Sequence, residues 1–189
     1  MVLPHGGPAA RDEWGFDWLV QFLTARGYAV LQPNYRGSSG YGEAWYGKNG
    51  FKAWDVAIGD VNDAGRWLVK EGIARGDSLA ILGWSYGGYA TARGAQRDPD
   101  VWKCAMAGAG VYDFPMMKAF DTRTFGSFGA NFQATSDDLI GISSARNTDG
   151  PWSPILIVAG LRDARIPIEQ SRTLVSRLKG SGKKEGVDF

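Results

Sequence analysis

The sequence predicts an α/β fold, in which helices cover both faces of a mostly parallel sheet. Short apolar runs alternate along the chain with longer segments whose apolar residues recur at helical spacing. The strand-like runs, such as residues 79–82 and 155–159, are apolar at every position. Strands of this kind are buried on both faces, as they are in a parallel sheet between two layers of helices.

In the N-terminal half, apolar spacing and flanking glycines mark each expected element. Residues 2–3 read as the end of a strand, and residues 28–32 as a short buried strand before a long glycine-rich loop at 33–50. One helix is expected before Gly27, and a second over about residues 54–70, before Gly72. Their expected inward faces are Phe16, Leu19, Val20 and Leu23 in the first, and Trp54, Ile58, Val61 and Leu68 in the second.

The C-terminal half continues the alternation of strands and helices. Strands are expected at 78–82 and 103–107, with a helix between them that Asp98-Pro99 stops. A strand at 155–159 precedes a last helix from near Pro167, and residues 187–189 read as the start of one more strand. Residues 112–150 are expected to be an irregular insertion over the carboxyl edge of the sheet, where α/β enzymes carry their sites.

Length and composition predict one globular domain, spanning residues 1–189. Apolar residues make up 44% of the chain, and its net charge of +1 gives no reason to expect a nucleic-acid partner. No apolar stretch reaches the roughly 18 residues of a membrane span, and no signal peptide is visible, which leaves the compartment open. Cys104 is the one cysteine, so no internal disulfide is possible, and no Cys/His spacing suggests a metal site.

The most informative motif is the run Gly-Trp-Ser-Tyr-Gly-Gly at residues 83–88, between an apolar strand and a helix. A Gly-x-Ser-x-Gly pattern in that position is typical of the nucleophile elbow of α/β-hydrolases. A serine on so tight a turn needs neighbours without a Cβ, so that the strand and the helix can approach each other. We therefore expect an α/β-hydrolase fold with Ser85 as its nucleophile.

A serine nucleophile needs a base to take its proton and an acid to orient that base. In α/β-hydrolases the acid follows the serine in the chain, in a loop after a later strand. Asp163 fits this place, because it follows the apolar strand at 155–159 and the turn Gly160-Leu161-Arg162. The alternative is a surface carboxylate or a helix cap. Asp137, Asp138 and Asp149 are rivals by residue type only, since no strand leads to them.

The developing oxyanion needs backbone N–H donors. One is expected from Tyr86, the residue after the nucleophile, and the other from the loop His5-Gly6-Gly7-Pro8, with Gly7 preferred to Gly6. His5 is the only histidine of the sequence, but it precedes Ser85 and lies in this loop. We expect it to hold the loop by side-chain hydrogen bonds and not to act as the base.

The histidine of the triad should follow the next strand after Asp163, and residues 187–189 read as the beginning of that strand. We therefore expect the catalytic histidine beyond residue 189. The start of the chain likewise reads as the middle of a domain. The sequence thus predicts an α/β-hydrolase domain that is incomplete at both ends.

Taken together, the motifs resemble the catalytic domain of the prolyl oligopeptidase family of serine peptidases, most closely its acylaminoacyl-peptidase and dipeptidyl-peptidase-like members. The matching segments are residues 5–8, 27–38, 40–42, 83–89, 160–167 and 170–171. The resemblance implies acyl transfer to Ser85 and hydrolysis of short peptides or acyl-peptides without a metal or another cofactor. It also implies a β-propeller domain in the full-length protein.

Three aromatic residues are candidates for the substrate pocket: Tyr41 in the glycine-rich loop, and Tyr112 and Phe114 after a strand end. For all three, a purely structural role is the alternative. Two other functions stay open, namely an esterase of small acyl esters and a non-catalytic remnant of a peptidase. If the final strand and helix are missing, the chain should also expose apolar surface and form homodimers or aggregate.

Overall fold

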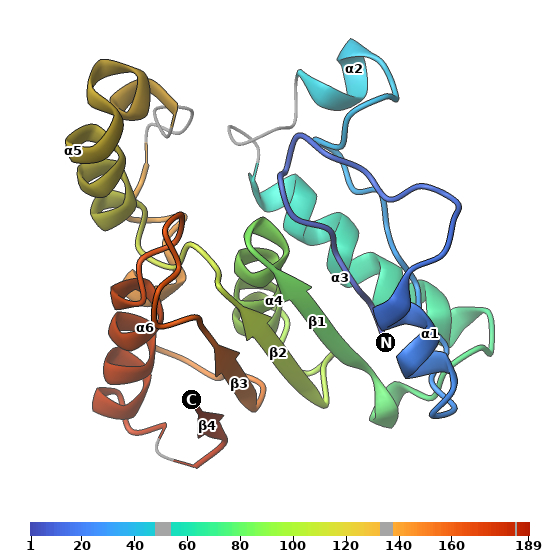
Figure 1. Ribbon diagram of the computed structural model, residues 1–189. Helices are drawn as coiled ribbons and strands as arrows, with labels where there is room; N and C mark the ends of the chain where they lie inside the picture. The colour runs from blue at the N-terminus through green and yellow to red at the C-terminus, as the bar shows by residue number, and fades with distance from the viewer. Residues whose placement is uncertain (48–53, 133–137, 184) are drawn as a thin grey trace.

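The computed structural model describes residues 1–47, 54–132, 138–183 and 185–189. Its centre is a parallel sheet in the order β1 (Ala80–Trp84), β2 (Cys104–Gly108), β3 (Ile155–Val158) and β4 (Val187–Asp188) (Figure 1). Val2 extends the sheet beyond β1, because it bridges in parallel to Ile81 on one side and to Leu31 on the other. The predicted parallel α/β architecture is confirmed.

One face of the sheet carries the main hydrophobic core. Alternate residues of the strands, among them Ile81, Ala105 and Ile157, are buried there. They pack against α3 (Trp54–Lys70), α4 (Tyr86–Arg97) and α6 (Glu169–Gly180). The bounds of α3 agree with the helix predicted over residues 54–70. This layer fixes α4 behind β1 and β2, and the turn between β1 and α4 is therefore rigidly placed.

The opposite face is covered less completely. Leu23 of α1 (Trp18–Thr24) packs there with Met1 and Ala80 in a smaller cluster. Farther along the same face, Trp84 is 56% exposed and Val158 is 44% exposed. The prediction of helices on both faces therefore holds, with the larger helical layer on the α4 side.

Two details of the N-terminal half differ from the sequence prediction. Residues 28–32 form no full strand, because only Leu31 pairs with a neighbour, through the bridge to Val2. Phe16 lies before the start of α1 and is 84% exposed, so it is not part of that helix's inward face. Over its described residues, 33–47, the glycine-rich loop contains one helical turn, α2 (Glu43–Tyr46).

The segment expected to be irregular contains α5 (Phe114–Phe132), two helical stretches that meet in a kink at Gly126, where φ is 62° and ψ is −142°. Pro115 fits the first turn of this helix. A backbone N–H there has no acceptor within the helix, so a residue without an N–H loses no hydrogen bond. The glycines and scattered aromatics of α5 concealed its helical spacing in the sequence. Short 3₁₀ turns, η2 (Gly76–Ser78) and η3 (Ser144–Arg146), complete the described elements.

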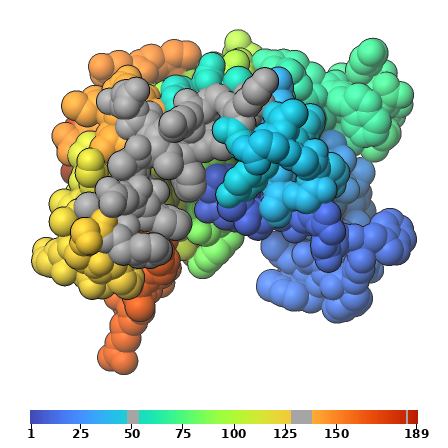
Figure 2. All heavy atoms as spheres, turned by 90° about the horizontal axis from the view of Figure 1, so that it is seen from above, coloured from blue at the N-terminus to red at the C-terminus, as the bar shows by residue number. Residues whose placement is uncertain are grey.

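The edge at which the strands end lies between two projecting elements. In Figure 1, α2 and α5 rise beyond the carboxyl ends of β1 and β2, and Figure 2 shows them from above on opposite sides of that edge. Ligands of open α/β sheets bind outside the carboxyl ends of the strands. Within the described part of the chain, no helix is long and apolar enough to cross a membrane.

Candidate active site

Ser85 lies at the apex of the turn between β1 and α4. It has φ 59° and ψ −121°, a conformation that residues with a side chain rarely adopt. The Ser85 N–H donates to Gly108 O of β2 at 2.9 Å, and Ser85 O accepts from Tyr89 N at 3.0 Å. The strained turn is thus held from both sides and presents the hydroxyl at the carboxyl edge of the sheet.

The glycines of the elbow are required by contact. A Cβ on Gly83 would lie 2.2 Å from Gly87 O, and a Cβ on Gly87 would lie 2.2 Å from Pro4 O. Both distances are far below van der Waals contact. The first glycine lets α4 approach β1, and the second lets the strand end at Pro4 approach α4. The Gly-x-Ser-x-Gly spacing therefore brings the loop after residue 4 up to the serine.

That loop, residues 5–8, lies directly beside the nucleophile. A Cβ on Gly6 would be 3.2 Å from Trp84 O and 3.4 Å from the Cβ of Ser85. Gly7 has φ 124°, a conformation that favours glycine and lets the backbone turn sharply. Both glycines predicted as oxyanion donors are therefore in the loop that faces Ser85.

His5 anchors this loop through both of its ring nitrogens. Nδ1 lies 2.6 Å from Gly6 O, and Nε2 lies 2.8 Å from Ser38 Oγ. The imidazole is also stacked on the ring of Tyr35, with the ring centroids 4.3 Å apart. These contacts agree with the expected role of His5 in holding the loop.

Tyr86, the other expected oxyanion donor, is the first residue of α4. The N–H groups of the first helical turn have no acceptor within the helix and point out of its N-terminus. The Tyr86 side chain is buried, at 5% exposure, which fixes the start of the helix. Burial also raises the pKa of the Tyr86 hydroxyl above its ordinary range, so this phenol stays neutral.

Asp163 follows β3 in a tight turn, as the sequence predicted. Its Oδ1 accepts from Arg165 N at 2.8 Å and from Ile166 N at 2.9 Å, and its own N–H donates to Gly160 O at 3.3 Å. Among the described residues, Oδ2 accepts no hydrogen bond and is available to an imidazole. Since β2 separates β1 from β3, the loops of Ser85 and Asp163 begin about 10 Å apart, a gap that an imidazole could bridge.

Two buried groups tie the Asp163 turn to the rest of the edge. Arg165 Nη1 pairs with Asp121 Oδ1 of α5 at 2.7 Å, and Asp121 is only 1% exposed. Gln170, in the first turn of α6, accepts from Tyr112 N at 2.9 Å and from Asp113 N at 2.8 Å. Its Nε2 also donates to Asp113 O at 3.0 Å. The acid is therefore fixed relative to the loop after β2.

The rival carboxylates are placed differently. Asp138 Oδ1 accepts from Gly141 N at 2.7 Å within a local turn, and Asp149 is exposed in a loop before β3. Asp137 lies outside the described residues. In the parts of the chain that are described, no group of three or more His, Cys, Asp or Glu side chains is arranged to hold a metal ion.

The comparison with known families agrees with this geometry. The sequence profile of the prolyl oligopeptidase family matches residues 14–189. The chain belongs to the prolyl oligopeptidase family. Its members are serine-type hydrolases that act on peptides, and an elbow serine with a carboxylate at the same sheet edge is the arrangement such hydrolysis needs.

Individual relatives are named for peptidase activities. The chain is 32% identical to dipeptidyl aminopeptidase BIII of Pseudoxanthomonas mexicana, over 95% of this chain and 27% of that protein. It is 25% identical to the human acylamino-acid-releasing enzyme, over 95% of this chain and 26% of that protein. The chain thus spans only about a quarter of the length of these prolyl oligopeptidase relatives.

Solved structures of peptidases share the fold. An acylaminoacyl peptidase in complex with Z-Gly-Gly-Phe-chloromethyl ketone superposes with a TM-score of 0.84 at 26% identity, covering 99% of this chain and 31% of that one. A puromycin-hydrolysing peptidase of Mycobacterium tuberculosis gives 0.81 at 31% identity, covering 95% and 28%. These likenesses show that the parallel sheet of the present chain is part of an α/β-hydrolase domain.

The three residues expected in a substrate pocket have different environments. Tyr41 is 52% exposed on its loop, where its hydroxyl accepts from Asn34 Nδ2 at 2.7 Å. Tyr112 and Phe114 are instead core residues, with exposures of 0% and 3%. The Tyr112 hydroxyl accepts from Gly110 N at 3.2 Å, and the ring of Phe114 packs edge-on against Tyr89. The last two side chains thus support the loop after β2 from inside and do not line an open cavity.

A cavity of about 730 Å³ lies on the less covered face of the sheet, beside the oxyanion loop. It is lined by Gly6, Trp84 and Leu156 among other mostly apolar residues, and its polar lining includes Asp12 and Gln32. Gln32 Nε2 donates to Asp12 Oδ1 at 3.2 Å, and burial raises the pKa of the Asp12 carboxyl. Sequence patterns do not reveal this cavity, because its wall comes from segments far apart in the chain.

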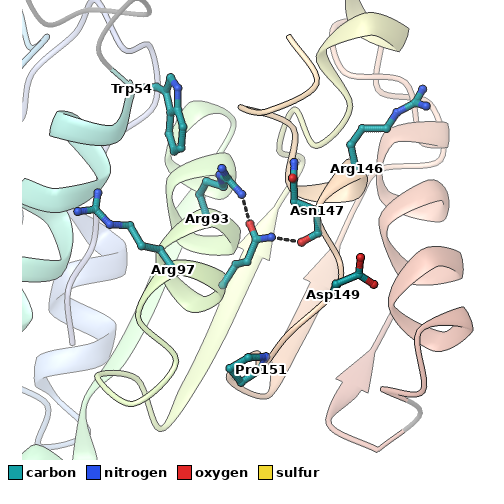
Figure 3. A pocket seen from close by; sticks show the side chains of 8 residues that line it. Trp54, Arg93, Arg97, Arg146, Asn147, Asp149 and Pro151 are labelled. Carbon is teal, nitrogen blue, oxygen red and sulfur yellow. Dashed lines mark hydrogen bonds between the residues drawn. The ribbon is translucent and has the colours of Figure 1, made fainter. Parts of the chain in front are cut away.

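A second cavity, of about 420 Å³, lies toward the opposite end of α4 (Figure 3). Arg93 is held there over the ring of Trp54, with its guanidinium carbon 4.5 Å from the centroid, and it donates to Gln96 and to Gly141 O. Gln96 in turn donates to Asn147 O. These contacts connect α3, α4 and the loop before β3. They lie toward the C-terminal end of α4, which has 12 residues, and therefore roughly 15 Å from Ser85. The cavity is therefore not part of the candidate active site.

Proposed function

We propose that this chain forms the nucleophile-bearing part of a serine peptidase that hydrolyses short peptides or acyl-peptides through an acyl-enzyme on Ser85. The observation that carries the proposal is the meeting of three features at one edge of the sheet. The strained serine, the glycine loop beside it and the turn of Asp163 all follow the carboxyl ends of parallel strands.

In the proposed reaction, Ser85 Oγ attacks the carbonyl carbon of the scissile bond while a histidine takes its proton. The oxyanion of the tetrahedral intermediate accepts from the N–H of Tyr86 and from that of Gly7 or Gly6. The histidine then gives the proton to the leaving amine, and the C–N bond breaks. Water, deprotonated by the same histidine, attacks the ester and releases Ser85. Asp163 Oδ2 holds the imidazole in the required tautomer.

The base is proposed to lie beyond residue 189, because His5 is committed to Gly6 O and Ser38 Oγ. A triad without its base keeps only the contribution of binding and of the oxyanion donors, which is about 10³–10⁴-fold over the uncatalysed reaction. The 189-residue chain by itself should therefore be weakly active or inactive.

The partners proposed for the longer protein follow from its relatives. Proteins named as a dipeptidyl aminopeptidase and as acylamino-acid-releasing enzymes match this chain over only about a quarter of their own length. We infer that a β-propeller domain accompanies this domain in the full-length protein and restricts access to short substrates. Tyr41, which is exposed, remains the candidate of the three aromatics for contact with the substrate.

Two alternatives are tested together with the peptidase. An esterase would use the same serine and oxyanion donors, and a non-catalytic remnant would keep the fold without a base. The experiment uses protein extended through the first histidine after residue 189. It compares hydrolysis of a blocked aminoacyl anilide with that of a short-chain nitrophenyl ester, in the wild type and in Ser85→Ala.

Anilide hydrolysis that is lost in Ser85→Ala supports the peptidase. Ester hydrolysis alone supports the esterase. Loss of neither activity in Ser85→Ala contradicts the proposal, and an absence of both activities in the extended wild type favours the non-catalytic remnant.

A further inference from the structure

We propose that Tyr35 is a positioning residue that fixes the two halves of the oxyanion hole relative to each other. The inference rests on the proposed function, because it concerns the geometry of the backbone donors around Ser85. Tyr35 itself does not touch the reacting atoms. It contacts the loop at residues 5–8 on one side and the side chain of Tyr86 on the other.

The contact with the loop is a hydrogen bond and a ring stack. The Tyr35 hydroxyl donates to His5 O at 2.7 Å, and the ring lies at 18° to the imidazole plane with a centroid separation of 4.3 Å. The carbonyl that accepts this bond belongs to the peptide unit that carries the N–H of Gly6. The hydroxyl of Tyr35 therefore sets the orientation of the peptide next to the proposed donors.

The contact with the other half of the oxyanion hole is between the aromatic rings of Tyr35 and Tyr86. The ring of Tyr35 stacks on that of Tyr86, with the centroids 5.9 Å apart and the planes at 26°. The backbone N–H of Tyr86 is the other proposed oxyanion donor. Since aromatic pairs of this kind keep a preferred offset, one side chain holds both donor segments at a set spacing.

Tyr35 can act in this way because its own backbone is fixed. Its carbonyl accepts from Ser38 Oγ at 2.6 Å and from Trp45 Nε1 at 3.2 Å. The next residue, Arg36, forms a bidentate pair with Asp60 of α3, at 2.8 and 2.6 Å. Tyr35 is thus attached to the helical layer, and the loop at residues 5–8 is attached to Tyr35.

Burial keeps the hydroxyl in its donor form. Tyr35 is 2% exposed, and burial raises the pKa of its phenol far above the ordinary range. The hydrogen bond to His5 O therefore persists across the pH range in which a serine peptidase works. Loss of this bond would leave a partly buried carbonyl without that donor and free the loop to shift against Tyr86.

The test is the substitution Tyr35→Phe in protein that extends through the catalytic histidine. A misplacement of about 1 Å in a catalytic group can cost about 100-fold in rate. We expect kcat for a blocked aminoacyl anilide to fall roughly 10- to 100-fold, with KM changed less than about twofold because the donors act in the transition state. The affinity for a peptide aldehyde, which forms a tetrahedral adduct, should fall in parallel.

Tyr89→Phe is the matched control. Tyr89 is 1% exposed and packs edge-on against Tyr86, but its hydroxyl forms no hydrogen bond with the loop at residues 5–8. Its removal should leave kcat and aldehyde affinity unchanged. Equal effects of Tyr35→Phe and Tyr89→Phe would overturn the proposal. A rise in KM with kcat unchanged in Tyr35→Phe would overturn it as well.

A second measurement separates this inference from the proposed function. Amide hydrogen exchange at Gly6 and Gly7 should be faster in Tyr35→Phe than in the wild type or in Tyr89→Phe, whether or not the protein hydrolyses peptides. Unchanged exchange would overturn the positioning role. Peptide hydrolysis that survives in Ser85→Ala would instead overturn the proposed function and leave the exchange result standing.

Discussion

At the scale of single residues, the site depends on a few groups whose environment differs sharply from that of chemically identical neighbours. Asp163 and Asp149 are both loop carboxylates near β3, but only Asp163 follows the carboxyl end of the strand and has one oxygen engaged by its own turn. The remaining oxygen is what an orienting acid needs. Residue type alone does not distinguish the two.

The first prediction concerns Asp163→Asn in protein that extends through the catalytic histidine. An amide at this position favours the wrong tautomer of the imidazole, so kcat should fall by about 10⁴-fold with little change in KM. Steady-state hydrolysis of an anilide substrate measures this effect. The matched variant Asp149→Asn should retain wild-type kcat, and equal losses in the two variants would contradict the assignment.

The second prediction concerns Asp12, whose pKa burial raises above its ordinary value. In the folded state the protonated form is favoured, so the contribution of Asp12 to stability falls as pH rises from its unfolded pKa of 3.8 through the raised folded pKa. Asp12→Asn should therefore increase stability at pH 7 more than at pH 3. Urea unfolding at the two pH values tests this, and an equal change at both would contradict it.

At the scale of elements, close approach between backbones holds the nucleophile in place. The strand β1 and the helix α4 meet at Gly83 and Gly87, where no Cβ can be accommodated. The first turn of α6 is joined to the loop after β2 by the three hydrogen bonds of Gln170. Ser85 and Asp163 are therefore carried by elements that cannot move independently.

The third prediction is that Gly87→Ala strongly destabilises the fold. The new methyl would lie 2.2 Å from Pro4 O, and overpacking of this kind costs about 1–3 kcal/mol or more. Gly180→Ala is the matched control, since no atom lies within 4 Å of a Cβ at the end of α6, and it should be neutral or stabilising by up to about 1 kcal/mol. Urea denaturation measures both; a Gly87→Ala protein as stable as Gly180→Ala would refute the steric argument.

The fourth prediction is that Gln170→Met destabilises the protein by roughly 3 kcal/mol, because two buried N–H groups and one carbonyl lose their partner. Gln21→Met on the exposed side of α1 has no such effect and controls for the change of residue type. Denaturant midpoints of the two variants provide the comparison. A difference between them of less than about 0.5 kcal/mol would show that the loop after β2 is held in another way.

The sequence predicted the parts of the site that local patterns encode. The elbow around Ser85 and the turn of Asp163 are each specified by a few consecutive residues next to an apolar strand. Tyr35 and Gln170 could not be found in this way, since their partners lie 30 and 57 residues away. Tyr112 and Phe114 were expected at a pocket because they follow a strand end, but the arrival of α5 and Gln170 buries them.

At the scale of the whole molecule, the two faces of the sheet are unequal. The α4 side carries the main core, whereas on the other side the described residues provide α1 and a cavity lined mostly by apolar residues. Large exposed apolar patches on a folded domain mark sites of contact with a protein, a membrane or a ligand, or surfaces prone to aggregation. We propose that this face drives self-association of the 189-residue chain.

The fifth prediction tests this proposal with Val158→Lys, at a strand residue that is 44% exposed on the less covered face. A charge there should shift the chain toward monomer, as measured by size exclusion with light scattering over a range of concentrations. Ile73→Lys changes a residue that is 50% exposed elsewhere on the molecule and should leave the oligomeric state as it is. A wild-type chain that is monomeric at every concentration would contradict the proposal.

The most direct test of the central claim is to locate the adduct of a fluorophosphonate probe by mass spectrometry, in protein that extends through the histidine. The account predicts a single labelled residue, Ser85, with labelling abolished in Ser85→Ala and much slower in Asp163→Asn. Labelling at another residue, or labelling that persists unchanged in Ser85→Ala, would show that Ser85 is not the nucleophile.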